Sequence, residues 1–295
     1  MHPRNRYAAP HDFPALARTE PGLTDYLVTL PDGRISRDFS NPAAVRLLNR
    51  SLLRRDYGLT HWDLPTGYLC PGVPGRLDYV HALADLLGAS AAERQPTDVR
   101  GLDIGTGASL IYPILAVREY GWRMVGVDVD ERSLKVAGAI IKFNQSALGG
   151  RISLRRQPQK TAVFHGVVGP EETFTFTMCN PPFFEDTAAA GAAAQRKWEK
   201  LGKASPRAEA TLNFGGSVSE LSTPGGEPAF LRRMIRESAD YRNQVKWFTT
   251  LVSKKGYLRI ADQELARLGH PRTEILPIGQ GGKRRRILCW TFSQH

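Results

Sequence analysis

The stretch MCNPPFF, residues 178–184, combines an amide, two prolines and two aromatic rings directly after a β-like run. One proline is enough for a turn, and a turn gains nothing from exposed aromatic rings. The Asn180 side chain and the Pro181 carbonyl are acceptors that neighbouring prolines would hold rigidly. Fixed acceptors suit chemistry on a planar NH₂ group, because its delocalised lone pair must be drawn out of plane before it reacts. The predicted catalytic residues are Asn180, Pro181, Pro182 and Phe183.

The two phenylalanines of this stretch allow two interpretations. Phe183 offers a face on which a flipped base could stack, and Phe184 would line or support the same pocket. Alternatively, the stretch is an Asn-Pro turn followed by two core side chains. Its position favours the first interpretation, because it ends the fourth strand of a predicted parallel sheet, at the edge where such sheets bind ligands.

A second stretch, LDIGTGAS at 102–109, places an acid, a glycine turn and a helix start in sequence. Gly105 and Gly107 lack the side-chain atoms that would keep a ligand from the backbone. Asp128 ends the next predicted strand, where a carboxylate can bind both ribose hydroxyls. The alternative role for Asp128 is a helix N-cap. A nicotinamide dinucleotide and S-adenosylmethionine both fit, and the D-x-G-x-G spacing favours S-adenosylmethionine.

Strands alternate with helices around these two stretches. Apolar runs predict strands at 99–104, 123–128, 152–154, 173–179, 245–252, 272–276 and 287–292. Helical periodicity predicts helices at 42–56, 77–87, 109–120, 131–148, 230–241 and 261–268. The alternation indicates an α/β fold with a mostly parallel seven-stranded sheet, and the final two strands indicate an antiparallel edge. Residues 185–228 interrupt this order and are typical of a functional loop or flexible insertion.

The charge of the chain indicates a polyanionic partner. Its 295 residues include 40 Lys and Arg against 29 Asp and Glu, a net charge of +11. The cations gather in short clusters with aromatic residues nearby, as RNA binding requires, although a merely soluble basic protein is the alternative. These clusters lie at 4–6, 46–55, 155–160, 196–203 and 283–286.

Other classes of protein are disfavoured. Cys70, Cys179 and Cys289 form no CxxC pair and no Cys/His cluster, so we expect neither a disulfide framework nor a metal site. No apolar run is long enough for a membrane-spanning helix, and the N-terminus lacks the apolar region of a secretory signal. We therefore expect an intracellular protein without membrane or metal partners.

Six stretches match one family across nearly the whole chain. They are HPRNRY (2–7), RLDYVH (76–81), LDIGTGASLIYP (102–113), PQKT (158–161), MCNPPFF (178–184) and RRILCWTF (285–292). By these stretches the chain resembles the methyltransferase-like protein sixteen family, which are eukaryotic N6-adenosine RNA methyltransferases. It is more distantly similar to the bacterial enzyme that methylates an adenine of large-subunit ribosomal RNA.

The resemblance implies a basic RNA-binding module at 1–75 and a Rossmann-like class I S-adenosylmethionine-dependent methyltransferase domain at 76–295, interrupted at about 185–228. Arg76 would reach the carboxylate of the cofactor, and the loop around Lys160 resembles one that can occlude its pocket. The implied cofactor-binding residues are Arg76, Gly105, Ser109, Asp128, Thr161 and Asn180. The expected RNA-binding residues are Arg4, Arg6, Lys160, Phe183 and Phe184.

The expected function is therefore N6-methylation of adenine in structured RNA, with U6 small nuclear RNA as the first choice. That substrate implies a nuclear location, with a cytoplasmic share as well. Ribosomal RNA and pre-mRNA hairpins are alternative substrates. A protein glutamine N5-methyltransferase is a further alternative, because NPP followed by an aromatic residue also fits enzymes that methylate a glutamine amide. One departure is Asp128, which stands where animal relatives have glutamate.

Overall fold

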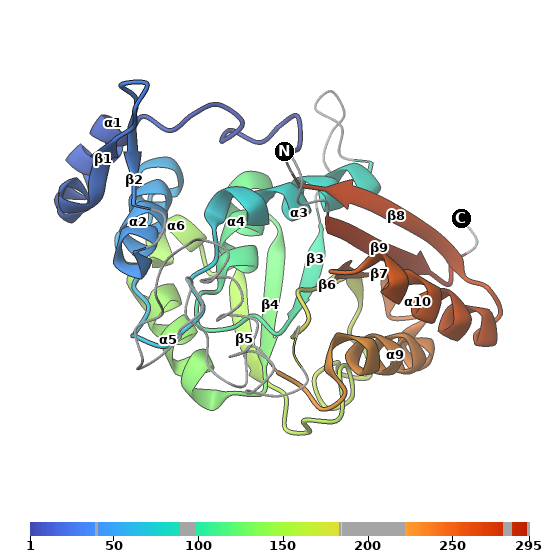
Figure 1. The fold of residues 1–295 in the computed structure, drawn as a ribbon. Coiled ribbons are helices and arrows are strands. Elements are labelled where there is room, and N and C mark those ends of the chain that lie inside the picture. The colour runs from blue at the N-terminus through green and yellow to red at the C-terminus, as the bar shows by residue number, and fades with distance from the viewer. Residues whose placement is uncertain (39–40, 89–97, 183, 185–221, 280–284, 294–295) are drawn as a thin grey trace.

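The computed structural model describes residues 1–38, 41–88, 98–182, 184, 222–279 and 285–293. A seven-stranded sheet in the order β5-β4-β3-β6-β7-β9-β8 forms its centre (Figure 1). The five strands from β5 to β7 are parallel, whereas β9 is antiparallel to both β7 and β8. The predicted sheet with its antiparallel edge is thereby confirmed. The strands are β3 (Arg100–Ile104), β4 (Arg123–Asp128), β5 (Ile152–Arg156), β6 (Phe174–Cys179), β7 (Val245–Val252), β8 (Arg272–Ile278) and β9 (Arg285–Thr291).

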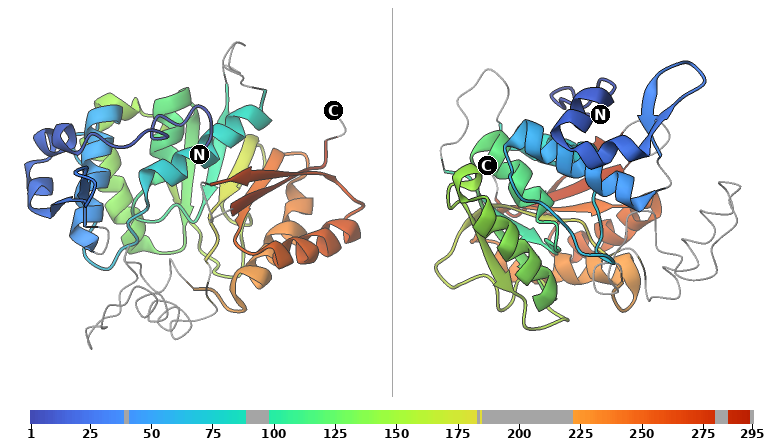
Figure 2. Two further views of the ribbon diagram at one scale, coloured as in Figure 1. Left: turned by 45° about the horizontal axis from the view of Figure 1, so that its top comes forward. Right: turned by 90° about the vertical axis from the view of Figure 1, so that its left-hand side faces the viewer.

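Helices cover both faces of this sheet (Figure 2). Successive side chains of a strand point to opposite faces, so each strand feeds two cores. Met178 packs into the core beneath α3 and α4, whereas Cys179 packs into the core beneath α9 and α10. The helices of the first face are α3 (Val73–Leu86), α4 (Ile111–Tyr120) and α5 (Glu131–Phe143), and those of the second are α9 (Gly226–Ser238) and α10 (Lys255–Arg267).

The N-terminal part of the chain packs on the first face. Asn41 caps α2 (Pro42–Tyr57) by accepting the N–H of Ala43 at 2.9 Å, which is the predicted cap followed by proline. Tyr7, Leu16 and Leu52 are buried in the same core as the residues of α3 and α4. The short elements α1 (Phe13–Thr19), η1 (Pro21–Tyr26), β1 (Leu27–Thr29) and β2 (Ile35–Arg37) precede α2 and are too short for a periodic signal.

Several predicted element boundaries were wrong. The helix predicted at 131–148 is broken at Asn144 into α5 and α6 (Gln145–Leu148). Helix α3 starts at Val73 rather than at residue 77, because a proline fits its first turn. Helices α9 and α10 also begin earlier than predicted, at Gly226 and Lys255, since each first turn contains a glycine, which is a weak helix former. A short 3-10 turn, η2 (Ala239–Tyr241), follows α9. Most of the predicted insertion at 185–228 lies outside the described residues.

The described residues contain neither a membrane-spanning helix nor a cluster of metal-ligating side chains. None of their helices is both long and apolar enough to cross a membrane. Their His, Cys, Asp and Glu side chains also form no group of three or more that could hold a metal ion.

Candidate active site

The glycine turn after β3 is pinned to the neighbouring strand. The N–H groups of Gly105 and Thr106 both donate to the carbonyl of Val127 on β4 at 2.9 Å. Gly105 and Gly107 have φ values of 74° and 63°, which glycine adopts without strain. No atom lies within 4 Å of the position that a Cβ on Gly105 would take, so the backbone there faces open space. The turn therefore presents bare backbone to a ligand, as the sequence predicted.

Asp128 joins this turn to the end of β4. Its carboxylate accepts the N–H of Gly107 and the N–H of Asp130, each at 2.9 Å. The cap of α5 is instead Asp130, whose carboxylate accepts from the N–H groups of Arg132 and Ser133. The alternative that Asp128 is only a helix cap is therefore excluded by the geometry.

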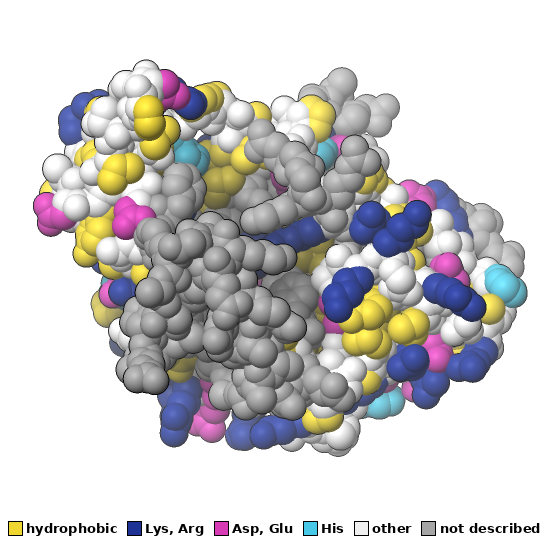
Figure 3. All heavy atoms as spheres, viewed as in Figure 1, with side chains coloured by type: hydrophobic (Ala, Val, Ile, Leu, Met, Phe, Trp, Pro, Cys, Tyr) yellow, Lys and Arg dark blue, Asp and Glu magenta, His cyan; other side chains and the backbone are white. Residues whose placement is uncertain are grey.

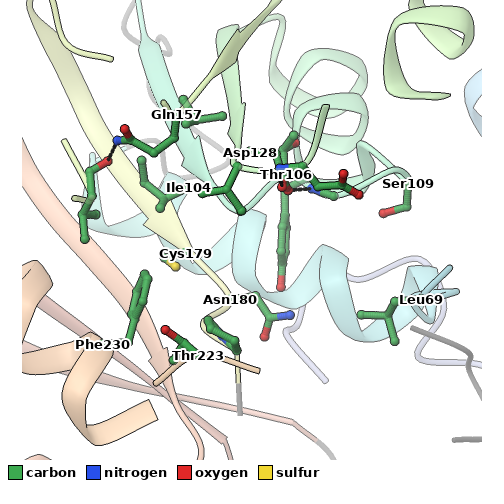
Figure 4. Close-up of a pocket in the computed structure, with 18 of the residues that line it drawn as sticks. Leu69, Ile104, Thr106, Ser109, Asp128, Gln157, Cys179, Asn180, Thr223 and Phe230 are labelled. Atoms are coloured by element: carbon green, nitrogen blue, oxygen red, sulfur yellow. Dashed lines mark hydrogen bonds between the residues drawn. The ribbon is translucent and has the colours of Figure 1, made fainter. Parts of the chain in front are cut away.

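A cavity of about 730 Å³ opens at the carboxyl edge of the parallel strands. Its size lies within the usual range for small-molecule sites. Figure 4 shows Asp128 and Thr106 toward one side of this cavity, with Asn180, Thr223 and Phe230 across from them. The predicted site residues that line it are Arg76, Gly105, Ser109, Asp128, Lys160, Asn180 and Pro182.

Asn180 stands directly after β6 with its side-chain oxygen buried. This oxygen has no hydrogen-bond partner within the described ranges. Pro182 lines the cavity, whereas Pro181 is buried and contributes no lining side chain. Phe183 lies outside the described residues. Phe184 is half-buried and pairs with Ser222, so the returning chain lies beside the NPP turn.

Thr161 is placed differently from the other predicted cofactor residues. Its side chain is exposed, and the cavity is lined by its neighbours Lys160 and Ala162 instead. The expectation that Thr161 contacts the cofactor therefore finds no support in the geometry of the cavity.

Sequence reasoning missed an aromatic ring in the site. Phe230, on the first turns of α9, lines the cavity from the side opposite the glycine turn. The guanidinium of Arg233 lies 5.7 Å from the centre of its ring. Helical periodicity marked Phe230 as part of a helix, but no local motif could show that the helix start turns into the cavity.

The acid of the LDIGTGAS stretch, Asp103, has surroundings that the sequence did not predict. Asp103 is fully buried on β3, and neither of its carboxylate oxygens has a hydrogen-bond partner in the part of the chain that the structure describes. Burial raises the pKa of Asp103 to about 7. Tyr112, which lines the cavity beside Arg76, likewise carries a buried hydroxyl without a described partner. Among the described residues, Tyr112 and Asn180 therefore each present a polar atom without a partner in the cavity lining, whereas Asp103 lies behind that lining.

Arg4 and Arg6 lie against the far ends of two helices that begin at the cavity. Arg4 pairs with Asp85 near the end of α3 and donates to the carbonyl of His81. Arg6 pairs with Glu119 near the end of α4 at 2.8 Å. Because Arg76 and Tyr112 belong to the first turns of these helices, the two arginines are separated from the cavity by most of each helix. Their RNA contacts stay a prediction.

A second hollow adjoins the cavity on the β5 side. Its volume is about 360 Å³, and it shares Arg132 and Lys160 with the larger cavity. Lys135 and Arg156 also line it, so the hollow has four cationic side chains. Its two acidic side chains are Asp130 and Glu131. We refer to Arg132, Lys135, Arg156 and Lys160 as the basic hollow. Elsewhere on the surface, Lys and Arg side chains gather over the α9 and α10 side of the face in Figure 3.

Comparisons with known proteins identify the family of the chain. A family described as RNA methyltransferase matches residues 1–294. The ribosomal RNA large subunit methyltransferase F of Stutzerimonas stutzeri is 49% identical over 295 residues, covering 99% of this chain and 90% of its own. The protein of the same name from Aeromonas salmonicida is 46% identical over 294 residues, covering 99% and 91%.

Solved structures give the same result. The human Mettl16 catalytic domain in complex with MAT2A 3′UTR hairpin 6 has a TM-score of 0.80 and 34% identity, covering 100% of this chain and 98% of that one. The N-terminal domain of human METTL16 in complex with SAH has a TM-score of 0.78 and 32% identity, covering 100% and 99%. The fold is therefore that of a Rossmann-like class I methyltransferase, and the cofactor is S-adenosylmethionine. The chain belongs to the RNA methyltransferase family.

Proposed function

We propose that this RNA methyltransferase transfers a methyl group to the N6 amine of an adenine in large-subunit ribosomal RNA. The observation that carries the proposal is the buried side-chain oxygen of Asn180, which has no partner among the described residues. A buried acceptor without a donor costs about 1–3 kcal/mol, so such a group is retained when the donor arrives with the substrate. An exocyclic amine brings that donor.

The cavity fits the cofactor. S-adenosylmethionine supplies an electrophilic methyl group on a positively charged sulfur. Arg76 lines the cavity where it can bind the carboxylate of the methionine part. Asp128 can bind the ribose hydroxyls, because a carboxylate has lone pairs beyond those that accept from Gly107 and Asp130. The buried Asp103 carboxylate adds negative charge that favours a cationic ligand.

The chemical role of the NPP turn follows from its acceptors. Asn180 and the Pro181 carbonyl would accept the two N–H groups of the adenine amine and hold its nitrogen with the lone pair turned toward the methyl group. Phe230 offers an aromatic face on the same side of the cavity, and Phe183 is the predicted second ring. Catalysis would therefore rest on positioning rather than on a strong base.

The RNA backbone would pass over the basic hollow. Lys135 and Arg156 both pair with Glu131, at 3.1 and 3.5 Å, but these pairs are more than half exposed and are therefore weak. They can turn to a phosphate, as can Arg132 and Lys160, which have no acid within pairing distance in the described ranges. The hollow adjoins the cavity, so a phosphate bound there would flank the reacting nucleotide.

The choice of ribosomal RNA over U6 RNA rests on the relatives. The bacterial proteins that share 46–49% identity over 99% of this chain are named for large-subunit ribosomal RNA. They support neither the U6 substrate nor the nuclear location that were expected from the sequence. Under this proposal the enzyme works in the compartment in which ribosomal subunits are assembled.

A methylation assay tests the proposal. Purified protein and labelled S-adenosylmethionine are incubated with deproteinised large-subunit ribosomal RNA from a strain lacking the enzyme, with small-subunit RNA and a U6 transcript in parallel. We expect label only in N6-methyladenosine of the large-subunit RNA. We also expect Asn180→Ala to lower the rate by about a hundredfold or more while still binding the cofactor. Label in U6 RNA would restore the first expectation. In a parallel incubation with cell extract, labelled product that survives RNase would favour glutamine methylation of a protein.

A further inference from the structure

A tyrosine on α3 lies directly behind β6, the strand that leads into Asn180. Tyr79 is fully buried, one helical turn after Arg76, and does not line the cavity. Its ring meets the ring of Tyr112 edge to face, with 5.4 Å between centroids. The same helix therefore carries a cavity residue and, one turn later, a hydroxyl that enters the core behind β6.

That hydroxyl is the middle of a directed chain of hydrogen bonds. Thr249 on β7 donates its only hydroxyl hydrogen to the carbonyl of Thr177 on β6 at 2.7 Å. The hydroxyls of Tyr79 and Thr249 are 2.8 Å apart, so Tyr79 must be the donor in that bond. The remaining lone pairs of the Tyr79 oxygen accept the N–H of Cys179 at 3.4 Å. The chain of bonds thus runs from Cys179 through Tyr79 and Thr249 to Thr177.

This chain of bonds lies where β6 and β7 stop pairing. The pairing of β6 with β7 ends at Thr177 and Phe248, whereas the pairing of β6 with β3 continues to Cys179. The last residue of β6 is therefore held by a strand on one side and by Tyr79 on the other. Asn180 follows immediately and takes its backbone position from Cys179.

We propose that Tyr79 is a positioning residue for methyl transfer. Its hydroxyl fixes the end of β6, so that the Asn180 acceptor points at the amine of the substrate. This inference rests on the proposed role of Asn180. Because Tyr79 does not line the cavity, removal of its hydroxyl should affect the rate of the chemical step and leave the binding of cofactor and RNA unchanged.

Kinetics of three variants test the inference. Tyr79→Phe removes the hydroxyl, Thr249→Val removes the next link, and Tyr241→Phe is the matched control, a buried tyrosine whose hydroxyl bonds to His165 at 2.7 Å. We expect Tyr79→Phe and Thr249→Val to lower kcat by about tenfold to a hundredfold, with KM for RNA and Kd for S-adenosylmethionine within about twofold of wild type. The double variant should be no slower than the slower single variant, because both break one chain of bonds.

Amide hydrogen exchange gives a second readout that needs no RNA. Losing its acceptor should speed exchange at the Cys179 amide by about tenfold in Tyr79→Phe but not in Tyr241→Phe. Unchanged kcat together with unchanged exchange would overturn the inference, as would an equal fall of kcat in the control. If Tyr79→Phe does not fold, the kcat of Thr249→Val tests the inference, with Tyr241→Phe still as its control. If wild type methylates no RNA, the proposed function fails, and the exchange experiment still decides whether Tyr79 holds the strand end.

Discussion

At the scale of single residues, Asp103 shows how a site can be built at the expense of stability. Its carboxylate is fully buried without a described partner, and desolvation raises its pKa to about 7. The pKa of aspartate in an unfolded chain is near 4, so the folded state binds the proton more tightly. The protonated form therefore favours folding, and this contribution is lost as pH rises from about 4 to about 7. Above that range the charged group weakens the fold.

Asp103→Asn should therefore stabilise the protein most at high pH. We expect its free energy of unfolding to exceed that of wild type by about 1–3 kcal/mol at pH 8. The difference should shrink as pH falls from 7 to 5, because wild-type Asp103 is then protonated and uncharged, as the asparagine is at every pH. Urea unfolding at several pH values checks this expectation, and calorimetry should show weaker binding of S-adenosylmethionine by the variant. A difference independent of pH would show that Asp103 is not protonated in the fold.

Phe230 gives a second prediction at this scale. Stacking of a base on an aromatic side chain contributes about 1–3 kcal/mol, so Phe230→Leu should lower kcat/KM for RNA by about tenfold or more. Phe230→Tyr keeps the ring and should stay close to wild type. Steady-state assays at saturating S-adenosylmethionine make the comparison. Equal losses in both variants would argue against stacking and for a packing role.

At the scale of elements, Asn144 explains why one long predicted helix is two. Its amide oxygen accepts the N–H of Thr60 at 2.7 Å, and its amide nitrogen donates to the carbonyl of His61 at 2.6 Å. Asn144 is buried and joins the end of α5 to the segment between α2 and α3. The apolar periodicity of 131–148 continues through this point, so only the tertiary contact reveals the break.

Asn144→Ala should accordingly destabilise the whole protein. Three backbone groups of the 60–61 segment, the N–H groups of Thr60 and His61 and the carbonyl of His61, would lose their side-chain partner. A typical hydrogen bond contributes about 0.5–1.5 kcal/mol. We expect the free energy of unfolding to fall by about 2–4 kcal/mol, measured by urea unfolding. Gln145→Ala, an exposed neighbour that starts α6, is the control and should stay near wild type. A mild effect of Asn144→Ala would mean that water replaces these bonds easily.

Residues at strand ends can be predicted from the sequence, whereas residues placed by tertiary packing cannot. Asp128, Asn180 and the glycine turn were predictable because each lies at the end of a strand, and parallel strands bring their carboxyl ends to one edge. Phe230 and Asp103 were not, since their roles depend on where a distant helix packs and on which buried groups lack partners. Thr161 was expected in the cavity only through the resemblance, and its exposed side chain does not line the cavity.

At the scale of the whole molecule, fewer cations are available to RNA than the clusters in the sequence suggest, because several arginines of these clusters are bonded to acids. Arg155 sits in a predicted RNA cluster, yet it is bonded to Glu172 at 2.5 and 2.6 Å, and these bonds hold the pKa of that carboxyl well below its usual range. Arg50 is likewise bonded twice to Glu20 at 2.7 Å. Such paired arginines link separate segments of the fold and are not available to phosphates. The cations available to phosphates are those, such as Arg156, whose pairs are exposed and weak.

The basic hollow can therefore be separated from the general charge of the molecule by salt dependence. Replacing Arg132 and Arg156 by Ala should weaken RNA binding and reduce the slope of log affinity against log salt by about 1–2, since each phosphate contact contributes about 0.7–0.9. Replacing Arg242 and Arg272 by Ala removes the same charge at the opposite edge of the sheet, where β7 and β8 begin, and should leave the slope nearly unchanged. Filter binding between 50 and 200 mM salt suffices for the measurement. Equal changes in the two pairs would mean that RNA responds to net charge alone and that the hollow is not on its path.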